Sequence, residues 1–335
     1  MTGPGRFSVE QVSGPAADAG ALVAPSAMGL CGTDLKILAG AIPVRYPRIL
    51  GHEMIGTVVR PGPEARFPEG SRVLVDPGVA CGRCRLCRND RTHLCPNGAL
   101  MGRDVDGGFA DLVAVDESRL HLVPPQLPAA EASLLQVLGT CVHAQTLVPV
   151  FPGETAVVLG LGVSGLLHVQ LLRARGIDRI VGVTRSAWKR ELAERLGATA
   201  TAAPEDAPRV VEAVTGGAGA ELVVESAGQL DAFVQAVDLA GAGGRVLVFG
   251  IAEAGPVELP AYQLYFKELE VTYARAAQPR DYAGAVGLAA SRRVQLAPLW
   301  SGSFPLEEAG RAFEAAGSPD SLKITLIGRE ENGHR

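Results

Sequence analysis

Short apolar runs broken by glycine and proline dominate the first part of the chain. Runs such as VLVDP, DLVAV and HLVPP, between Met1 and about Val137, have the length and the β-branched content of strands. Glycine and proline interrupt these runs too often for long helices to form. The pattern predicts an irregular, barrel-like unit built mainly of β-strands.

The pattern changes near Glu131 to an alternation of helices and strands. The segment ASLLQVLGTCVHAQTLV has helical spacing, and Pro152 and Gly153 follow it. After it come TAVVLGLG, VSGLLHVQLLRARG, DRIVGVT, AWKRELAERLG, ELVVESAG, DAFVQAVDLAG and GRVLVFG. Such alternation predicts an α/β domain with a doubly wound parallel sheet. It ends after about Tyr273, and we expect the rest of the chain, including LKITLIG, to return to the first unit.

Composition narrows the class of protein and of partner. The 335 residues suffice for two domains, and 47% hydrophobic with 20% charged residues is ordinary for a soluble globular protein. A net charge of −5 without a basic run argues against nucleic acid as a partner. The sequence contains neither an apolar run long enough to span a membrane nor a signal peptide. These features predict a cytoplasmic protein that does not bind membranes.

Four cysteines lie close together in the segment CGRCRLCRNDRTHLC. Cys81, Cys84, Cys87 and Cys95 follow the pattern C-x2-C-x2-C-x7-C, and two-residue spacings suit tetrahedral metal ligation. The segment has almost no apolar residues, so a bound metal must replace a core, and such binding contributes about 10–16 kcal/mol in peptide models. The alternative is a disulfide pair in a secreted loop. Because no secretory segment precedes the cluster, we predict a structural zinc.

A glycine-rich loop follows the first strand of the alternating region. Gly160, Gly162, Val163, Ser164 and Gly165 belong to GLGVSG, a G-x-G-x-x-G motif that opens a helix. The first glycine permits a tight turn, the second permits close approach of a pyrophosphate, and the third permits close helix packing. The alternative is a glycine-rich turn without a ligand. The strand before it and the helix after it favour dinucleotide binding.

The end of the next strand indicates which dinucleotide binds. Sites for NAD usually carry an acidic residue there, which binds the ribose 2′-hydroxyl. This chain has Thr184 and Arg185 instead, followed by Lys189 and Arg190. A hydroxyl and a guanidinium suit a 2′-phosphate, whereas Lys189 and Arg190 also fit a solvated helix face. We therefore predict NADP as the preferred cofactor, with NAD possible.

Two further motifs complete a resemblance to a known family. Cys31 in GLCGTDLK and His52 in GHEMIGTVV lie 21 residues apart, which suits two loops converging on one site. Together with YPRILGHEMIGTVV, the cysteine cluster, DGGFADLVAV, GLGVSG and LKITLI, they make the chain resemble the zinc-containing medium-chain dehydrogenase/reductase family. Its polyol, threonine and glucose dehydrogenase branches are the most similar. The resemblance implies a GroES-like catalytic domain (1–137 and 275–335) and a Rossmann cofactor domain (138–274).

The resemblance also implies a second, catalytic zinc. Cys31 and His52 would be ligands, and Glu53 would be a nearby carboxylate able to enter or leave the coordination sphere. The third protein ligand falls on Gln136, where the family pattern has an acidic residue or cysteine. A carboxamide is a weaker zinc donor, so this is a departure from the pattern. Cys141 is the other candidate thiolate, and its ordinary interpretation is a small buried hydrophobe.

Further residues take roles from the same resemblance. Thr33 matches the relay hydroxyl that carries the alcohol proton, while Lys36 stands where a relay histidine sometimes occurs. Lys323 matches a basic residue directed toward the cofactor phosphates, although a lysine at a strand edge is the alternative. Glu225 falls at a strand end near the expected nicotinamide and has no assigned role.

These observations favour a zinc-dependent oxidoreductase that transfers a hydride between a secondary alcohol and NADP. The branch of the family implies a polyol, sugar or cyclitol as substrate, and relatives in the family form dimers or tetramers. One alternative is a reductase of an activated C=C or C=N bond that has lost the catalytic zinc through Gln136. The other alternative is a nucleotide-sensing protein without catalysis. Intact Cys31, Thr33, His52 and Glu53 argue against the sensor, since a sensor needs none of them.

Overall fold

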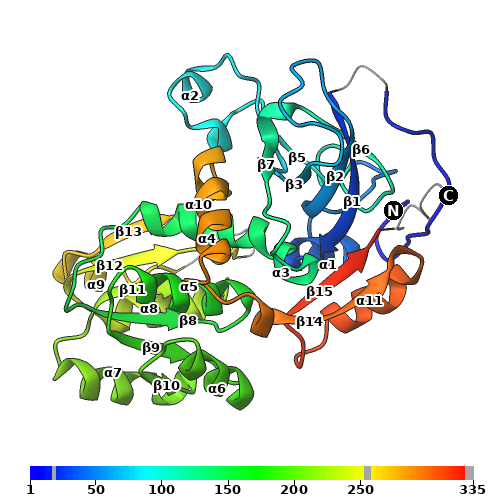
Figure 1. The fold of residues 1–335 in the computed structure, drawn as a ribbon. Helices are drawn as coiled ribbons and strands as arrows, with labels where there is room; N and C mark the ends of the chain where they lie inside the picture. Colours follow the sequence, from blue (N-terminus) through cyan, green and yellow to red (C-terminus); the bar gives the residue numbers. More distant parts are fainter. Residues whose placement is uncertain (17–19, 253–257, 329–335) are drawn as a thin grey trace. The chain divides into compact units, whose positions relative to one another are not determined.

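The computed structural model describes residues 1–16, 20–252 and 258–328, which form two compact units. Unit 1 comprises Met1–Gly139, Gln278–Ala290 and Leu296–Arg335, and unit 2 comprises Thr140–Ala277 with Ser291–Gln295. The chain therefore returns to the first unit near its C-terminus, and five residues of that returning segment belong to unit 2. Figure 1 shows the course of the chain in colour, from blue at the N-terminus to red near the C-terminus.

Unit 1 is built around a mixed seven-stranded sheet. Its path runs β14-β15-β1-β2-β3-β7, and β6 pairs with β1. Most neighbours are antiparallel, and the exception is β14 beside β15. The elements of this unit are β1 (Ala21–Gly29), α1 (Gly32–Leu38), β2 (Glu53–Arg60), β3 (Arg72–Val75), β4 (Gly78–Val79), α2 (Arg85–Arg88), η1 (Thr92–Leu94), β5 (Ala99–Leu100), β6 (Val113–Val115), η2 (Glu117–Arg119), β7 (Leu120–Leu122), α3 (Ala129–Ala132), α10 (Pro279–Ala290), η4 (Ala297–Leu299), β14 (Trp300–Pro305), η5 (Leu306–Glu308), α11 (Ala309–Ala316) and β15 (Lys323–Ile327), where η denotes a 3-10 helix.

Strand β1 lies between β2, β6 and β15 and carries much of the core of unit 1. Ala21, Val23, Ala27 and Met28 are fully buried, and buried positions alternate with half-buried ones over the first six residues. The period of two places one face of the strand in the core. Helix α11 covers this core with Phe313. The sheet thus fixes where the ends of β1, β2 and β15 lie.

Unit 2 is a six-stranded parallel sheet flanked by helices. Its strand order is β10-β9-β8-β11-β12-β13, and each strand pairs in parallel with its neighbours. Its elements are β8 (Thr155–Leu159), α5 (Val163–Ala174), β9 (Arg179–Val183), α6 (Ala187–Arg195), β10 (Ala200–Ala202), η3 (Pro204–Asp206), α7 (Ala207–Thr215), β11 (Ala220–Glu225), α8 (Leu230–Leu239), β12 (Ala240–Val248), α9 (Ala261–Phe266) and β13 (Glu270–Tyr273). Helix α4 (Leu135–Thr146) begins in unit 1 and ends in unit 2.

The order of strands in unit 2 reverses between β8 and β11. From β8 the chain moves outward to β9 and β10, and it then returns to β11 and moves the other way to β12 and β13. All five residues of β8 are buried, as expected for a central strand covered on both faces. In open parallel sheets, ligands bind beyond the carboxyl ends of the strands at such a reversal. We therefore expect a ligand site at the carboxyl end of β8.

The predicted fold class is confirmed: an α/β domain with a parallel sheet accompanies a β-rich unit. One detail differs from the prediction. The segment ASLLQVLGTCVHAQTLV is not one helix: α3 ends within it, with Ser133 as its C-cap, and α4 begins at Leu135. Across the residues that the structure describes, none of the helices has both the length and the apolar character needed to cross a membrane.

Candidate metal and dinucleotide sites

The topology of unit 1 brings Cys31, His52 and Glu53 together. Cys31 is the N-cap of α1, just after β1 ends, and Glu53 is the first residue of β2. Because β1 and β2 are antiparallel, with Gly29 opposite Glu53, the end of one strand meets the start of the next. One donor atom from each of the three residues lies within 4.8 Å of the others. The predicted convergence of the two loops is observed.

A buried aspartate organises this cluster. The Oδ2 atom of Asp34 accepts the backbone N–H of Cys31 at 2.9 Å, and Oδ1 lies 3.6 Å from Nδ1 of His52. Burial lowers the pKa of His52, but the Asp34 carboxylate and the Cys31 thiol outweigh it and hold the pKa well above its usual value. Because the carboxylate faces Nδ1, we expect Nε2 to be the nitrogen that ligates a metal. The thiol, imidazole and carboxylate are donors that suit Zn²⁺.

Glu53 is paired with a buried lysine that was predicted to serve elsewhere. The ammonium of Lys323 contacts Oε2 of Glu53 and donates to the Leu30 carbonyl at 3.0 Å, and Lys323 is only 3% exposed. Gly29 makes the pairing possible, since a Cβ there would overlap the Glu53 carboxylate. The structure adds this pairing, and the assignment of Lys323 to the cofactor phosphates stays a prediction. Its charge is already neutralised inside unit 1.

Gln136 is buried on α4 and has a partner that the sequence did not reveal. Its Nε2 lies 3.4 Å from the hydroxyl of Tyr282 on α10, and Tyr282 is 1% exposed. Because Nε2 is directed at Tyr282, the carbonyl oxygen Oε1 is the atom of Gln136 that could ligate a metal. The sequence gives no signal for this pair, because 146 positions separate the two residues.

Thr33 and Cys141, the two other candidates for the catalytic site, differ in burial and belong to different units. Thr33 is half-buried in the first turn of α1, two positions after Cys31. Cys141 is fully buried in unit 2, with its Sγ 3.8 Å from the carbonyl oxygen of Ser164. The environment of Cys141 matches its interpretation as a small buried hydrophobe.

The four-cysteine segment forms a compact set of thiols. One sulfur atom from each of Cys81, Cys84, Cys87 and Cys95 lies within 4.8 Å of the others, and all four residues are free cysteines. Cys84 caps α2 and accepts the Cys87 backbone N–H at 3.4 Å. Backbone N–H groups of Arg83 and Cys84 lower the pKa of Cys81 to about 6. Burial raises the pKa of Cys87 to about 12, so the thiolate form is favoured at Cys81 and not at all four positions. Four sulfur atoms this close together suit a tetrahedral zinc.

The glycine-rich loop of unit 2 has the predicted form. Gly160 follows β8 with a φ of +87°, and a Cβ on Gly165 would overlap the Gly160 carbonyl oxygen. Gly162 is the N-cap of α5, and a Cβ there would meet nothing within 4 Å. Val163 and Ser164 form the first turn of that helix. The loop thus leaves open backbone at a helix N-terminus, where a phosphate can approach.

The end of β9 carries the predicted basic residues. Thr184 is half-buried and Arg185 is exposed. The Nη1 atom of Arg190 donates to the carbonyl oxygens of Thr184 and Arg185 at 2.8 and 3.0 Å, and Nζ of Lys189 lies 5.1 Å from the ring centroid of Trp188. Arg190 therefore stabilises the turn after β9, and its guanidinium lies beside the backbone of Thr184 and Arg185, the residues predicted to bind the 2′-phosphate.

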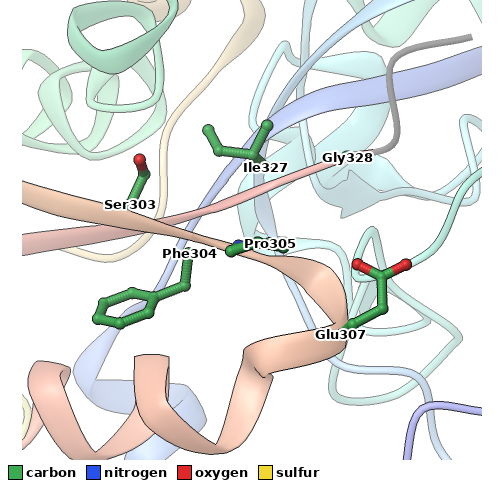
Figure 2. A pocket seen from close by; sticks show the side chains of 6 residues that line it. All are labelled: Ser303, Phe304, Pro305, Glu307, Ile327 and Gly328. Carbon is green, nitrogen blue, oxygen red and sulfur yellow. The ribbon is translucent and has the colours of Figure 1, made fainter. Parts of the chain in front are cut away.

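A separate pocket of about 330 Å³ lies in unit 1 (Figure 2). Ile327, at the far end of β15, is four residues beyond Lys323, which corresponds to about 13 Å along a strand. The pocket therefore does not coincide with the Cys31–His52–Glu53 cluster. Its lining contains one carboxylate and consists of Ser303, Phe304, Pro305, Glu307, Ile327 and Gly328.

Comparisons with known proteins identify the family of the chain. Residues 17–125 match the model of the alcohol dehydrogenase GroES-like domain, and residues 164–291 match that of the zinc-binding dehydrogenases. A 2-dehydro-3-deoxy-L-galactonate 5-dehydrogenase of Pseudoalteromonas atlantica is 32% identical over 89% of both chains. An L-threonine 3-dehydrogenase of Bacillus subtilis is 31% identical over 91% of this chain and 90% of its own.

Solved structures are similar over almost the whole length. A chain described as a zinc-binding dehydrogenase of Sinorhizobium meliloti, bound to NADP, is 35% identical with a TM-score of 0.89 and 96% coverage of both chains. An alcohol dehydrogenase of Thermus sp. ATN1 is 29% identical with a TM-score of 0.91, covering 98% of this chain and 99% of that one. The predicted family is confirmed, and the chain belongs to the zinc-binding alcohol dehydrogenases, which are oxidoreductases.

Proposed function

We propose that the protein is a zinc-dependent dehydrogenase that transfers a hydride between NADP and a secondary alcohol of the polyol, sugar or sugar-acid class. The observation that carries this proposal is the cluster of half-buried Cys31 with buried His52 and Glu53, with donor atoms within 4.8 Å of one another. The substrate class is supported by the names of relatives, which include a sorbitol dehydrogenase of Bacillus subtilis and an L-galactonate-5-dehydrogenase of Escherichia coli.

The donor sets fit two zinc ions per chain. Cys31 and His52 would hold the catalytic ion, with Glu53 and the Oε1 atom of Gln136 as the remaining oxygen donors. Cys81, Cys84, Cys87 and Cys95 would hold the structural ion. When bound at the first site, zinc supplies a Lewis acid that lowers the pKa of an alcohol.

The chain's own residues orient the site and accept the proton. Asp34 accepts the backbone N–H of Cys31 and places a carboxylate oxygen 3.6 Å from Nδ1 of His52, so its charge attracts the ring and its bond holds the Cys31 backbone. Alcohol oxidation releases one proton for each hydride transferred, and the Thr33 hydroxyl would relay it toward solvent. Lys323 compensates the charge of Glu53 and so limits the negative charge of the cluster.

The cofactor would bind at the reversal of strand order in unit 2. The pyrophosphate would approach the open backbone of GLGVSG at 160–165, and the 2′-phosphate would approach Thr184 and Arg185. The Sinorhizobium meliloti relative bound to NADP supports this cofactor. A carboxylate at this turn would repel a 2′-phosphate, and residues 184–186 contain none.

Reduction of NADP in the presence of single alcohols tests the proposal. The zinc-loaded protein is assayed at 340 nm with sorbitol, xylitol, L-threonine, L-galactonate and myo-inositol, each with NADP and with NAD. We expect NADPH formation with at least one polyol or sugar acid. Asp34→Asn, which retains the shape of the orienting side chain, should lower kcat. An absence of alcohol-dependent turnover in a protein with both zinc sites filled would overturn the assignment.

We also propose that the protein is a homodimer joined through the β13 edge of unit 2. β13 is an edge strand, and the neighbouring α9 exposes Tyr262, Tyr265 and Phe266 by 75%, 85% and 73%. An exposed edge strand beside aromatic side chains is a typical pairing surface. Light scattering of the wild type and of Tyr265→Lys tests this, since the wild type should be dimeric and the variant shifted toward monomer. A monomeric wild type would contradict it.

A cytoplasmic location completes the proposal. Four cysteines that hold a metal as thiolates need a reducing compartment, since oxidation to disulfides would remove the ligands. A fluorescent fusion in the native organism should therefore be distributed through the cytoplasm, and export of the fusion would contradict this.

A further inference from the structure

Glu225 is a buried carboxylate at the reversal of strand order, and the proposed chemistry does not use it. It is the last residue of β11, and it lies opposite Leu159 of β8 on one side and Val248 of β12 on the other. Leu159 directly precedes the glycine-rich loop. Glu225 is 1% exposed, so its environment is set by the protein backbone around it.

The side chain and the backbone of Glu225 fix two different loops. Its Oε1 accepts the backbone N–H groups of Ala227 and Gly228 at 2.8 and 2.7 Å. Its carbonyl oxygen accepts the N–H groups of Phe249 and Gly250 at 2.8 and 3.0 Å. Burial raises the pKa of Glu225, and the surrounding backbone N–H groups act against this. Hydrogen bonds to an ionised carboxylate are about twice as strong as neutral ones.

Glycines bring these loops into backbone contact. Gly228 has a φ of +68°, and a Cβ there would lie 2.9 Å from the carbonyl oxygen of Ile251. A Cβ on Gly250 would overlap the N–H of Gly228 and lie 2.7 Å from Oε2 of Glu225. A Cβ on Gly160 would lie 2.7 Å from the backbone nitrogen of Ala227. The glycine-rich loop, residues 226–228 and residues 249–251 therefore form one packed surface around Glu225.

This surface also contains a polar group without a partner. Within the described ranges, the hydroxyl oxygen of Ser226 is buried and makes no hydrogen bond. An unsatisfied buried hydroxyl is unfavourable, and a ligand that hydrogen-bonds to it would recover that cost. The backbone N–H of Ser226 donates to the Leu159 carbonyl at 2.8 Å, so the residue is fixed beside the glycine-rich loop.

The direction of the dinucleotide follows from the order of the strands. Thr184 and Arg185, at the end of β9, would take the 2′-phosphate end, and the loop after β8 would take the pyrophosphate. The other half of the molecule then extends over β11 and β12, where the loops fixed by Glu225 lie.

We propose that Glu225 is a positioning residue for the nicotinamide half of the cofactor. Its carboxylate and carbonyl hold residues 226–228 and 249–251 in the arrangement against which the nicotinamide riboside binds. This inference rests on the proposed dinucleotide function. It assigns Glu225 no contact with the reacting atoms.

Calorimetric binding of two ligands to the full-length, zinc-loaded protein tests the proposal. NADP contains the nicotinamide riboside, and 2′-phospho-ADP lacks it while keeping the 2′-phosphate and the pyrophosphate. In Glu225→Gln the charge is lost, and the Kd for NADP should rise about tenfold while the Kd for 2′-phospho-ADP stays within about twofold. Glu225→Asp, whose carboxylate is one methylene shorter, should show the same selectivity and provides a second variant if Glu225→Gln does not fold.

Glu221 offers a matched control on the same strand. Its carboxylate accepts the backbone N–H of Thr155 at 2.7 Å, at the opposite end of β11. Glu221→Gln should change neither Kd, although it removes the charge from a comparable backbone-to-carboxylate bond. Equal weakening of both ligands in the Glu225 variants would overturn the inference, as would unchanged NADP binding. A wild type that binds neither ligand would instead refute the dinucleotide function itself.

Discussion

Removing the positive charge of Lys323 should destabilise unit 1 strongly, because it leaves the buried Glu53 carboxylate without a counter-charge. Lys323 and Glu53 are 3% and 1% exposed, so Lys323→Met leaves Glu53 without a counter-charge and with almost no access to water. Breaking a buried pair of this kind costs about 3–5 kcal/mol. Restoring neutrality in Glu53→Gln/Lys323→Met should recover most of that loss, since the two effects are coupled.

The pH of the experiment follows from the pKa of Lys323. Burial lowers that pKa, but attraction to Glu53 and to Cys31 outweighs it, and the pKa is raised above the ordinary 10.5. The folded-state value exceeds the unfolded one, so the stability from this charge is fully present below pH 10.5. It is lost only as the pH rises through the raised pKa. A measurement near pH 7.5 therefore reports the whole contribution.

Urea unfolding followed by the fluorescence of Trp300 isolates unit 1. The chain has two tryptophans, so a Trp188→Phe background leaves Trp300 on β14 as the reporter. The protein is first dialysed against a mild chelator, because a cation beside Glu53 would replace the missing charge. Lys267→Met is the control, since Lys267 caps carbonyl oxygens in unit 2 at 2.8–2.9 Å and pairs with no buried carboxylate. Equal stability of Lys323→Met and the parent, or no recovery in the double variant, would refute the reasoning.

Three further predictions concern acid stability, cofactor choice and metal retention. Burial lowers the pKa of His168 from 6.5 to about 3, so the folded state resists protonation that the unfolded state accepts. Between pH 6.5 and 4, His168→Gln should reduce the pH slope of the unfolding free energy by about 1.4 kcal/mol per pH unit, and an unchanged slope would contradict this. Arg185→Ala should raise the KM for NADP about tenfold with little change for NAD, whereas equal effects on both would refute the 2′-phosphate role. Gln136→Glu should slow the loss of the catalytic zinc to a chelator, because a carboxylate is a stronger zinc donor than a carboxamide, and an unchanged rate would exclude Gln136 from the coordination sphere.

Local patterns determined most of what the sequence predicted correctly. The glycine-rich loop and the four-cysteine cluster each lie within one short segment, so spacing alone brings their members together. Cys31 and His52 were predictable as neighbours because each lies at a strand end, and such ends meet in an antiparallel pair.

The contacts that the sequence did not predict depend on pairing between distant segments. Lys323 and Glu53 are 270 positions apart in the sequence and lie on β15 and β2, on either side of β1. They can pair across β1 because Gly29 has no side chain to separate them. Tyr282 meets Gln136 because α10 belongs to unit 1 although it follows unit 2 in the chain. The role of Glu225 depends on its register with β8 and β12. Periodicity specifies which face of a strand is buried, but it does not specify which strand lies alongside.

The zinc content of the wild type and of Cys31→Ala tests the central claim most directly. After gel filtration in metal-free buffer, mass spectrometry of the protein should give two zinc ions per chain for the wild type and one for Cys31→Ala. Adding Cys87→Ala to Cys31→Ala should remove the remaining ion, because it deletes a thiol of the four-cysteine set. One zinc per chain in the wild type, or two in Cys31→Ala, would contradict a catalytic metal at Cys31, His52 and Glu53.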